Sequence, residues 1–490
     1  MKSSTPITRR QAIAAATSAV ASVTGAALLA PRDAFAQQAK PNIIYIMADD
    51  LGYADLSCYG RRDYQTPNID RLAAGGMRFT QAYANSSVCS ATRTALITGR
   101  YQYRLRIGLE EPLGGTNPDI VLPKDKPTLP SLLRDVGYGT TLLGKWHLGS
   151  VVGSGPLQNG YDHFFGFRGG GVDYFTHKSG IASTNTGDLW DDDAKVETAG
   201  YLTDLLGQHA VKVITDSAKV KKPFFISLHF NAPHWPWEGP NDEAESKRIG
   251  AIADYDGGSL AIYATMVAAM DRQVGNILAA LDRTGVANNT IVIFTSDNGG
   301  ERFSDTWPFS GRKTELLEGG LRIPAIVRWP GHIAKGSVTK QVGISMDWLP
   351  TLVAAAGAKL DPNYLPDGAN LLPVLTGGPT FPRKLYWRYK YNSQEAVRDG
   401  DMKWLKIRDN TYLFNVVDDP LERANLSKRQ PDVYKRLTSD YAEWSATMLP
   451  LDPKSSSAGL GAATNPDRPN SNAPAPGAKG AAKGAPAAQK

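Results

Sequence analysis

The chain has 490 residues and a mass of 52.9 kDa, and 42% of its residues are hydrophobic, which is enough for a large buried core. The composition excludes a collagen, a coiled coil and a disulfide scaffold, since two cysteines cannot cross-link a chain of this length. The formal net charge of +6 would suit an anionic partner, but residues 1–36 and residues 451–490 each contribute +3 and the segment between them is neutral. We therefore expect no nucleic-acid partner.

Residues 1–36 have the pattern of a signal peptide. Arg9-Arg10 precede a modestly apolar stretch, and the small-x-small tripeptide at 34–36 predicts cleavage before Gln37. The paired arginines favour twin-arginine export machinery, which would place the mature protein in the periplasm or outside the cell. A membrane anchor is the alternative, but the stretch is rich in Ala, Ser and Thr. We expect a mature protein that does not span the membrane.

Four short apolar runs each stop abruptly in polar residues. They span residues 42–48, 139–143, 224–230 and 290–295. Continuous apolarity predicts strands that are buried on both faces, as in a parallel sheet covered by helices. Helices are expected from Thr66-Pro67 to Gly75-Gly76, over 128–136 and over 260–283. This alternation predicts an α/β fold with a doubly wound, mostly parallel sheet flanked by helices.

Polar side chains follow these four strands, where an open α/β sheet binds its ligands. The residues that would share one crevice are Asp49, Asp50, Lys145, His147, His234, Asp297 and Asn298. The pairs at 49–50 and 297–298 offer four hard oxygen donors, which suit Ca²⁺ or Mg²⁺ better than zinc. A single acidic pair more often caps a helix or lies in a solvated turn. Two pairs, each after a buried strand, predict a metal site.

Cys89 is surrounded in the sequence by hydroxyl side chains. Residues 92–97 predict a helix, so Cys89 would lie near its N-terminus with Arg93 one turn later, where the helix dipole and the guanidinium favour a thiolate. A buried structural cysteine is the default alternative, and Cys58 fits that description. A disulfide between the two cysteines has little support.

The pattern changes after about residue 380. Short strands are expected at 384–391, 395–398, 402–407 and 412–416, with a hairpin turn at Asp399-Gly400 and a helix over 432–448. Residues 381–450 therefore predict a small subdomain with an antiparallel sheet and a helix, after a main catalytic domain over 37–380. Residues 451–490 contain no aromatic residue and are rich in Ala, Pro, Gly and Lys, which predicts a solvated tail.

The chain resembles the type I sulfatases of the alkaline phosphatase superfamily, and within them the arylsulfatases and N-acetylgalactosamine-6-sulfatases, from about Pro41 to Leu426. The strongest match is Cys89-Ser90-Ala91-Thr92-Arg93 followed by residues 96–100. It is similar to the signature in which the cysteine is oxidised enzymatically to Cα-formylglycine. Further matches lie at 144–149, 232–234, 296–299, 311–314, 318–320, 413–415, 419–422 and 425–426. The family's common form has proline where this chain has Ala91, which concerns the route of maturation.

The resemblance implies a sulfuric ester hydrolase that acts on an aryl sulfate, another small sulfate ester or a sulfated glycan. A formylglycine-generating enzyme would convert Cys89, and the hydrate of residue 89 would be the nucleophile. One divalent cation, Ca²⁺ or alternatively Mg²⁺, would activate it. The implied cation ligands are Asp49, Asp50, Asp297, Asn298 and residue 89 itself.

The resemblance also implies roles for five further side chains. Lys145 and Lys313 would neutralise the sulfate oxygens in the transition state. His234 would protonate the leaving alcohol, and His147 would be the base that helps to expel sulfate and restore the aldehyde. Arg93 would orient the hydrate. Removal of residues 451–490 is expected to leave turnover of a small sulfate ester nearly unchanged.

Two other functions remain open from the sequence. One is a phosphonate or phosphate monoester hydrolase of the same superfamily; a phosphatase would normally carry Ser or Thr at position 89, whereas phosphonate hydrolases can also use formylglycine. The other is a sulfated-glycan-binding protein with an unmodified Cys89. His229, inside an apolar run, is expected to be a packed core histidine. Residues 151–202 and 235–263 are expected to shape the mouth of the site, without deciding between aryl and carbohydrate sulfates.

Overall fold

The computed structural model describes residues 40–114, 117–179, 186–249 and 257–457. The described residues from Pro41 onward form one compact unit. The predicted signal peptide, with Arg9 and Arg10, lies outside the described residues.

An eleven-stranded mixed sheet forms the centre of this unit. Its strands are β1 (Asn42–Ala48), β2 (Met77–Tyr83), β3 (Gly139–Lys145), β4 (His163–Phe167), β5 (Trp190–Asp191), β6 (Ala194–Lys195), β7 (Phe224–His229), β8 (Thr290–Ser296), β9 (Arg322–Arg328), β10 (Ser337–Thr339) and β11 (Gly343–Ile344). Their order is β10-β2-β9-β8-β1-β7-β3-β4-β5-β6, with β11 beside β2. The run β8-β1-β7-β3-β4 is parallel, and β9 is antiparallel to both of its neighbours. The four strands predicted from the sequence are therefore adjacent, at the centre of a mostly parallel sheet.

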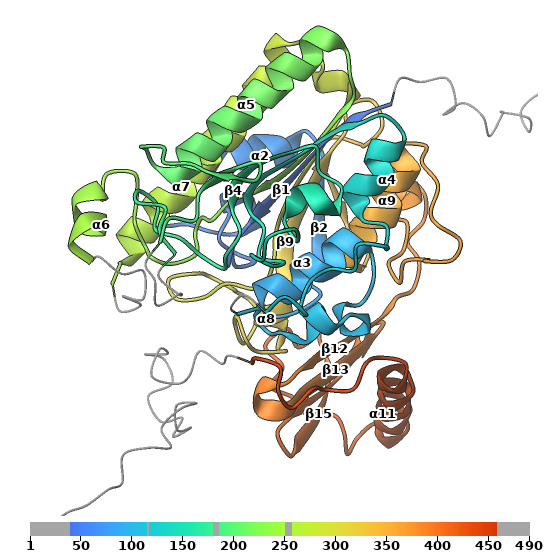
Figure 1. Cartoon of the computed structure of the whole chain (residues 1–490). Coiled ribbons are helices and arrows are strands. Elements are labelled where there is room, and N and C mark those ends of the chain that lie inside the picture. Colours follow the sequence, from blue (N-terminus) through green and yellow to red (C-terminus); the bar gives the residue numbers. More distant parts are fainter. Residues whose placement is uncertain (1–39, 115–116, 180–185, 250–256, 458–490) are drawn as a thin grey trace, which may run out of the picture. The chain divides into compact units, whose positions relative to one another are not determined.

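Helices cover both faces of the sheet (Figure 1). They are α2 (Pro67–Ala74), α3 (Cys89–Thr98), α4 (Leu129–Asp135), α5 (Leu202–Val220), α6 (Glu243–Ile249), α7 (Leu260–Arg283), α8 (Glu318–Leu321), α9 (Trp348–Ala355) and α10 (Leu372–Leu375). The predictions of α2, α4 and α7 are confirmed. The 19-residue helix α5 was not predicted. Among the described residues, no helix is both long enough and apolar enough to cross a bilayer.

The central strand β1 shows why an uninterrupted apolar run predicts a two-sided strand. Ile44 and Ile46 belong to a core that contains side chains of α2, α5 and α7. Ile43 and Tyr45 point to the other face, into a core with side chains of α3, α4 and α9. Each such side chain contributes about 1.5–3 kcal/mol when it is fully buried, so both faces of β1 stabilise the sheet. The predicted doubly wound α/β fold is confirmed.

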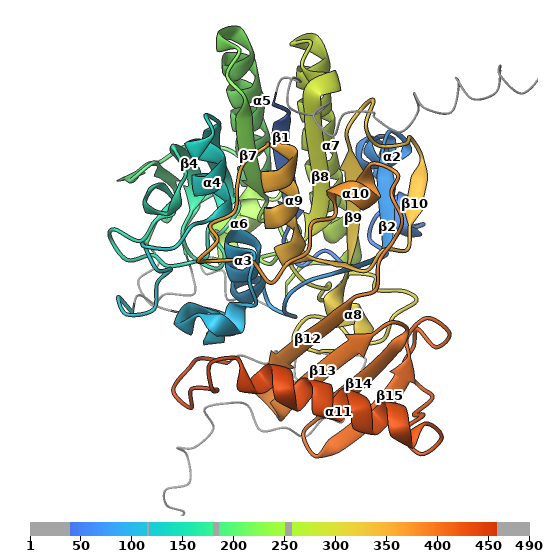
Figure 2. The same ribbon diagram turned by 90° about the vertical axis from the view of Figure 1, so that its right-hand side faces the viewer.

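A four-stranded antiparallel sheet follows the main sheet in the chain. It consists of β12 (Lys384–Tyr389), β13 (Gln394–Asp399), β14 (Met402–Ile407) and β15 (Asn410–Asn415), in that order, and is followed by α11 (Pro431–Ala446). Helix α11 lies across this sheet (Figure 2), where Leu437 and Tyr441 pack on Val397, Trp404 and Leu413. The predicted antiparallel sheet and helix are confirmed.

The first residues of the predicted tail are folded. Residues 451–457 run back along residues 106–112, and the Ser456 amide donates to Glu110 Oε2 at 2.6 Å. The sequence prediction is wrong for this short stretch, because hydrogen bonds to a partner distant in the sequence can order a segment that buries little apolar surface of its own. Residues 458–490, the rest of the predicted tail, lie outside the described residues.

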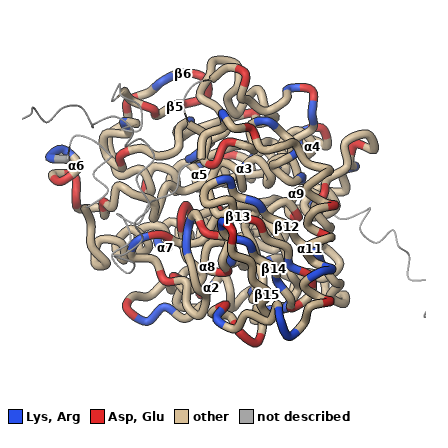
Figure 3. The backbone as a smooth tube through the Cα atoms, turned by 90° about the horizontal axis from the view of Figure 1, so that it is seen from below, with Lys and Arg blue, Asp and Glu red and all other residues tan. Residues whose placement is uncertain are grey.

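Charges of both signs alternate along the described chain. Figure 3 shows Lys and Arg interspersed with Asp and Glu over the underside of the molecule. This distribution agrees with the neutral charge balance of residues 37–450.

Candidate active site

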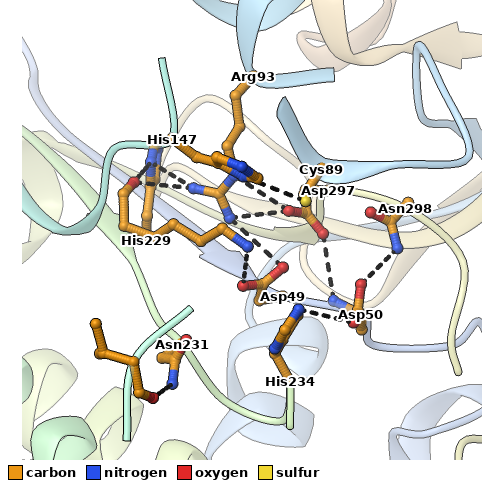
Figure 4. A network of polar contacts seen from close by, with 12 residues as sticks. Asp49, Asp50, Cys89, Arg93, His147, His229, Asn231, His234, Asp297 and Asn298 are labelled. Atoms are coloured by element: carbon orange, nitrogen blue, oxygen red, sulfur yellow. Dashed lines mark hydrogen bonds and ion pairs between the residues drawn. The ribbon is translucent and has the colours of Figure 1, made fainter. Parts of the chain in front are cut away.

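The ends of β1, β3, β7 and β8 bring the predicted site residues together (Figure 4). Because these strands are adjacent and parallel, their carboxyl ends lie along one edge of the sheet. Asp50 and His147 have φ angles of 64° and 54°. These left-handed conformations turn the chain sharply just after the strands and direct both side chains into the site.

Three buried carboxylates each form an ion pair with a buried cation. The pairs and their N–O distances are Lys145 with Asp49 (2.6 Å), Lys313 with Asp50 (2.6 Å) and Arg93 with Asp297 (2.8 Å). All six side chains are at most 8% exposed. A buried charge is costly unless it is paired, so this arrangement concentrates charge that water cannot screen.

Cys89 is the first residue of α3, and it contacts His147. The Cys89 Sγ atom lies 3.3 Å from His147 Nδ1, and His147 Nε2 lies 2.9 Å from the Leu113 carbonyl oxygen. A carbonyl oxygen only accepts, so Nε2 carries the imidazole proton and the Nδ1 lone pair faces residue 89. His147 is therefore held in the tautomer that accepts a proton from residue 89.

The stabilised thiolate predicted for Cys89 is not found. Burial raises the pKa of the thiol, and the nearby charge of Lys145 only partly offsets this effect. Arg93 acts on the thiol only through space, because its Nε and Nη2 atoms donate to Asp297 Oδ2 and not to Sγ. The prediction is wrong because a helix N-terminus favours a thiolate only where solvent or a direct cationic partner assists.

Arg93 links three of the strand ends. Besides its ion pair with Asp297, its Nη1 atom donates to the Lys145 carbonyl oxygen at 2.9 Å and lies 3.2 Å from His229 Nδ1. His229 is buried, as expected for a core histidine, and its Nε2 atom lies 2.8 Å from Ser227 Oγ. It therefore belongs to the support of Arg93, a contact that the sequence pattern did not indicate.

His234 faces the carboxylates from the end of β7. Its Nδ1 atom donates to the Trp235 carbonyl oxygen at 2.6 Å, and its Nε2 atom lies 3.6 Å from Asp50 Oδ2. Burial lowers the pKa of the imidazole, and the charge of Lys313 lowers it further. The unprotonated Nε2 therefore faces a carboxylate oxygen that Lys313 Nζ already contacts at 2.6 Å.

The donor set fits a hard divalent cation. Within the part of the chain that the structure describes, the Oδ1 atoms of Asp49 and Asn298 are buried and accept no hydrogen bond, although the Asn298 amide group donates to Asp50. Burial raises the pKa of Asp49, and the neighbouring charge of Asp297 raises it further. Two groups of side chains are close enough to share one ion: Asp49 with Asp50 and His234, and Asp49 with Cys89 and Asp297. A cation would satisfy the unpaired oxygens and offset the repulsion between the carboxylates.

A glycine loop that the sequence analysis did not single out touches both histidines. A Cβ atom on Gly170 would lie 2.8 Å from His147 Nε2, and one on Gly171 would lie 3.3 Å from His234 Cε1. A side chain at Gly170 would clash with the His147 ring, whereas one at Gly171 would require the His234 ring to shift slightly. The run Gly169-Gly170-Gly171 is the signal in the sequence that could have identified the loop.

The segment that carries Lys313 is held from the four-stranded sheet. Gln394 accepts from the Leu316 amide and donates to the Thr314 carbonyl, at 2.8 and 2.9 Å. Lys403 Nζ lies 3.0 Å from both the Glu318 and Glu422 carboxylates. The sequence matches at 318–320 and 419–422 therefore meet in space at one lysine.

The segments that form this site lie within regions that match known protein families. The family described as "Sulfatase" matches residues 41–358, and the family described as "N-sulphoglucosamine sulphohydrolase, C-terminal" matches residues 311–444. The chain is 30% identical to Arylsulfatase J of Mus musculus, over 87% of this chain and 80% of that protein. It is 33% identical to N-acetylgalactosamine-6-sulfatase of Rattus norvegicus, over 74% of this chain and 71% of that protein.

A solved structure shows that the likeness extends to three dimensions. The crystal structure of Ps i-CgsB in complex with k-i-k-neocarrahexaose superposes with a TM-score of 0.77 at 31% sequence identity. The superposition covers 89% of this chain and 98% of that chain. It therefore includes most of the compact unit.

Proposed function

The chain belongs to the sulfatase family and is a hydrolase of sulfate esters, and on this premise we propose that it works through a Cα-formylglycine made from Cys89. The substrates would be aryl or carbohydrate sulfate monoesters, the two classes that the names of its relatives include. One bound Ca²⁺, or alternatively Mg²⁺, would be held by Asp49, Asp50, Asp297, Asn298 and residue 89. The unpaired buried oxygens of Asp49 and Asn298 support this ligand set.

The first half of the reaction transfers the sulfuryl group to residue 89. One hydroxyl oxygen of the formylglycine hydrate would attack sulfur and release its proton to the neighbouring Asp297 carboxylate, while the bond between sulfur and the alcohol oxygen breaks. When bound, the divalent cation supplies Lewis-acid polarisation at the hydroxyl and at the sulfate. Lys145 and Lys313 stabilise charge on the sulfate oxygens. His234 would give a proton to the leaving alcohol after its Nε2 atom, which is unprotonated in the structure because burial lowers the imidazole pKa, has taken one up.

The second half releases sulfate. His147 Nδ1 takes the proton from the remaining hydroxyl of residue 89, the bond between its carbon and the sulfate oxygen breaks, and the aldehyde forms again. Water then restores the hydrate. Arg93 would orient the hydrate indirectly, through its contacts with Asp297 and the Lys145 carbonyl.

The observation that carries the proposal is the contact of residue 89 with His147. The 3.3 Å separation of Cys89 Sγ and His147 Nδ1 puts a fixed proton acceptor beside the atom that conversion would replace with oxygen. Mass spectrometry of the peptide that contains residue 89, from protein made in its native host, tests the chemistry. We expect a loss of about 18 daltons from the cysteine form. An unmodified thiol in fully active protein would refute the mechanism.

Competing esters test the reaction class. We expect the specificity constant for an aryl or carbohydrate sulfate to exceed that for a matched phosphonate monoester, and a preference for the phosphonate would overturn the choice of substrate. A Cys89→Ala variant is the matched control for both assays.

The protein would be exported after maturation of Cys89 in the cytoplasm, since folding buries the thiol before twin-arginine transport.

A further inference from the structure

The last described residues of the chain form a strap, which we define as residues 449–457. It begins just after α11, where the Leu449 amide donates to the Tyr103 carbonyl at 3.0 Å and the Leu449 carbonyl accepts from Arg388. The strap then passes along the segment that leads from α3 toward the active site. Asp452 forms an ion pair with Arg106 at 3.0 Å on this path.

The end of the strap is hydrogen-bonded to residues 110–112. The Ser456 amide donates to Glu110 Oε2 at 2.6 Å, and the Glu111 amide donates to the Ser456 carbonyl at 3.2 Å. The Ser456 hydroxyl donates to the Pro112 carbonyl at 2.7 Å. Three bonds through one residue fix the position of this short segment.

Lys390 fastens the strap from the other side. Its Nζ atom donates to the carbonyl oxygens of Asp452, Pro453 and Ser455, at 3.0, 3.1 and 2.6 Å. The Lys390 amide donates to Glu111 Oε2 at 3.0 Å. A single lysine therefore ties the strap to the same segment that Ser456 holds.

The segment under the strap ends at the active-site histidine. The Leu113 amide donates to Ser90 Oγ at 2.7 Å, and Ser90 Oγ donates to the Glu110 carbonyl at 3.3 Å. The carbonyl oxygen of the same residue, Leu113, accepts a hydrogen bond from His147 Nε2 at 2.9 Å. Ser90 follows Cys89 directly in the chain, so residues 110–113 are tied to Cys89 through Ser90 and to His147 through the Leu113 carbonyl.

We propose that the strap positions His147, acting through residues 110–113. It holds the Leu113 carbonyl where it fixes the Nε2–H tautomer and keeps the Nδ1 lone pair directed at residue 89. This inference rests on the proposed function, because it takes His147 to be the base of the second step. Lys390 and Ser456 are positioning residues, and neither touches the substrate.

The variant Lys390→Met removes the fastening but leaves the strap sequence intact. A misplaced base costs up to about 100-fold in rate, so we expect kcat to fall by about 10- to 100-fold while KM changes by less than about twofold. A chain ending at Leu451 should show the same fall, which replaces the expectation from the sequence that residues 451–490 can be removed without effect on turnover. A chain ending at Ser457 and the variant Lys384→Met, a partly buried lysine of β12 that pairs with Asp440, are the matched controls and should stay near wild type.

A double-mutant cycle with His147→Ala distinguishes the positioning of His147 from a general structural effect on the site. If the strap acts through His147, Lys390→Met should have little further effect on kcat in the His147→Ala background. Multiplied effects would show a purely structural role and overturn the inference, as would full activity of both Lys390→Met and the chain ending at Leu451. If the shorter chain does not fold, the Lys390→Met cycle decides.

Hydrogen exchange gives a readout that does not depend on sulfatase activity. The Leu113 amide is not bonded to the strap, yet it should exchange faster in Lys390→Met than in wild type or Lys384→Met, because the segment loses its fastening. Unchanged protection of Leu113 would refute the coupling. A wild-type protein that hydrolyses no sulfate ester would refute the proposed function instead, and hydrogen exchange at Leu113 would still decide about the strap.

Discussion

Replacing Lys403 with Met should destabilise the fold strongly, because it leaves two buried carboxylates without their shared cation. Lys403 Nζ lies 3.0 Å from both Glu318 and Glu422, and all three side chains are completely buried. Glu318 keeps its ion pair with Arg322, but Glu422 has no other cation within ion-pair distance among the described residues. Removing one partner of a buried pair costs about 3–5 kcal/mol, so we expect a loss of this size in the free energy of unfolding.

The loss should depend on pH in a defined direction. Burial raises the pKa of Glu422 to about 7, with the charge of Lys403 opposing the effect. In wild type the protonated carboxyl stabilises the fold at acidic pH, and this contribution is lost as the pH rises to about 7. Above that pH Glu422 ionises beside Lys403 in wild type but stays protonated in Lys403→Met. The deficit of the variant should therefore grow by about 1.4 kcal/mol for each further pH unit.

Urea unfolding at pH 6 and pH 8.5 measures both effects. The matched control is Lys406→Met on the same strand, since Lys406 points to the opposite face, is 33% exposed and pairs with Glu395. Such a partly exposed pair is worth less than about 1 kcal/mol. The reasoning is refuted if Lys403→Met loses no more stability than Lys406→Met, or if its deficit shrinks as the pH rises.

Three further predictions concern the site and the export of the protein. Gly170→Ala should lower kcat by about 10- to 100-fold, because the new methyl group would displace the His147 ring. The control Gly187→Ala should keep wild-type kcat, since its methyl group would meet no neighbouring atom. Equal kcat values for the two variants would contradict the loop contact. Dialysis against a chelator should abolish turnover of a sulfate ester and added Ca²⁺ should restore it, with the residue-89 peptide unchanged in mass; turnover that survives complete removal of divalent ions would argue against the cation site. Replacing Arg9 and Arg10 with Lys should leave uncleaved precursor inside the cell, as fractionation and immunoblotting would show, and normal export would exclude the twin-arginine route.

The four adjacent strands at the centre of the sheet could be predicted because a run of consecutive apolar residues indicates a strand that is buried on both faces. Residues 43–48 are apolar throughout, and the structure buries their side chains alternately on the two faces of the sheet. The same argument located the strand ends, and parallel order then brought Asp49, Asp297 and His147 together without further information. The resemblance to the sulfatases identified Cys89 for a similar reason, since the signature is local in the sequence.

Contacts between distant segments were decided only by the tertiary structure. The sequence gives no local signal that Lys403 lies between Glu318 and Glu422, or that Ser456 binds Glu110, because each pair is separated by many residues and depends on how the sheets pack. The antiparallel strand β9 and helix α5 were missed for lack of a distinctive end signal. The glycine loop at 169–171 gained its meaning only when its distance from His147 was known.

Electrostatic properties of the site also depend on the fold. The sequence suggested a thiolate at Cys89, but burial reverses the shift of the thiol pKa, and Arg93 turns away to Asp297. A pKa depends on the solvent and charges around a group, which are set by every segment that packs against it. The sequence by itself thus determined the family and the central sheet and indicated the candidate site residues, whereas the tertiary structure decided the surroundings of those residues, their contacts with the second sheet and the path of the strap. Local sequence patterns indicate which residues are buried and where the chain turns. Only the packing of distant segments determines which side chains meet and which of them are shielded from water.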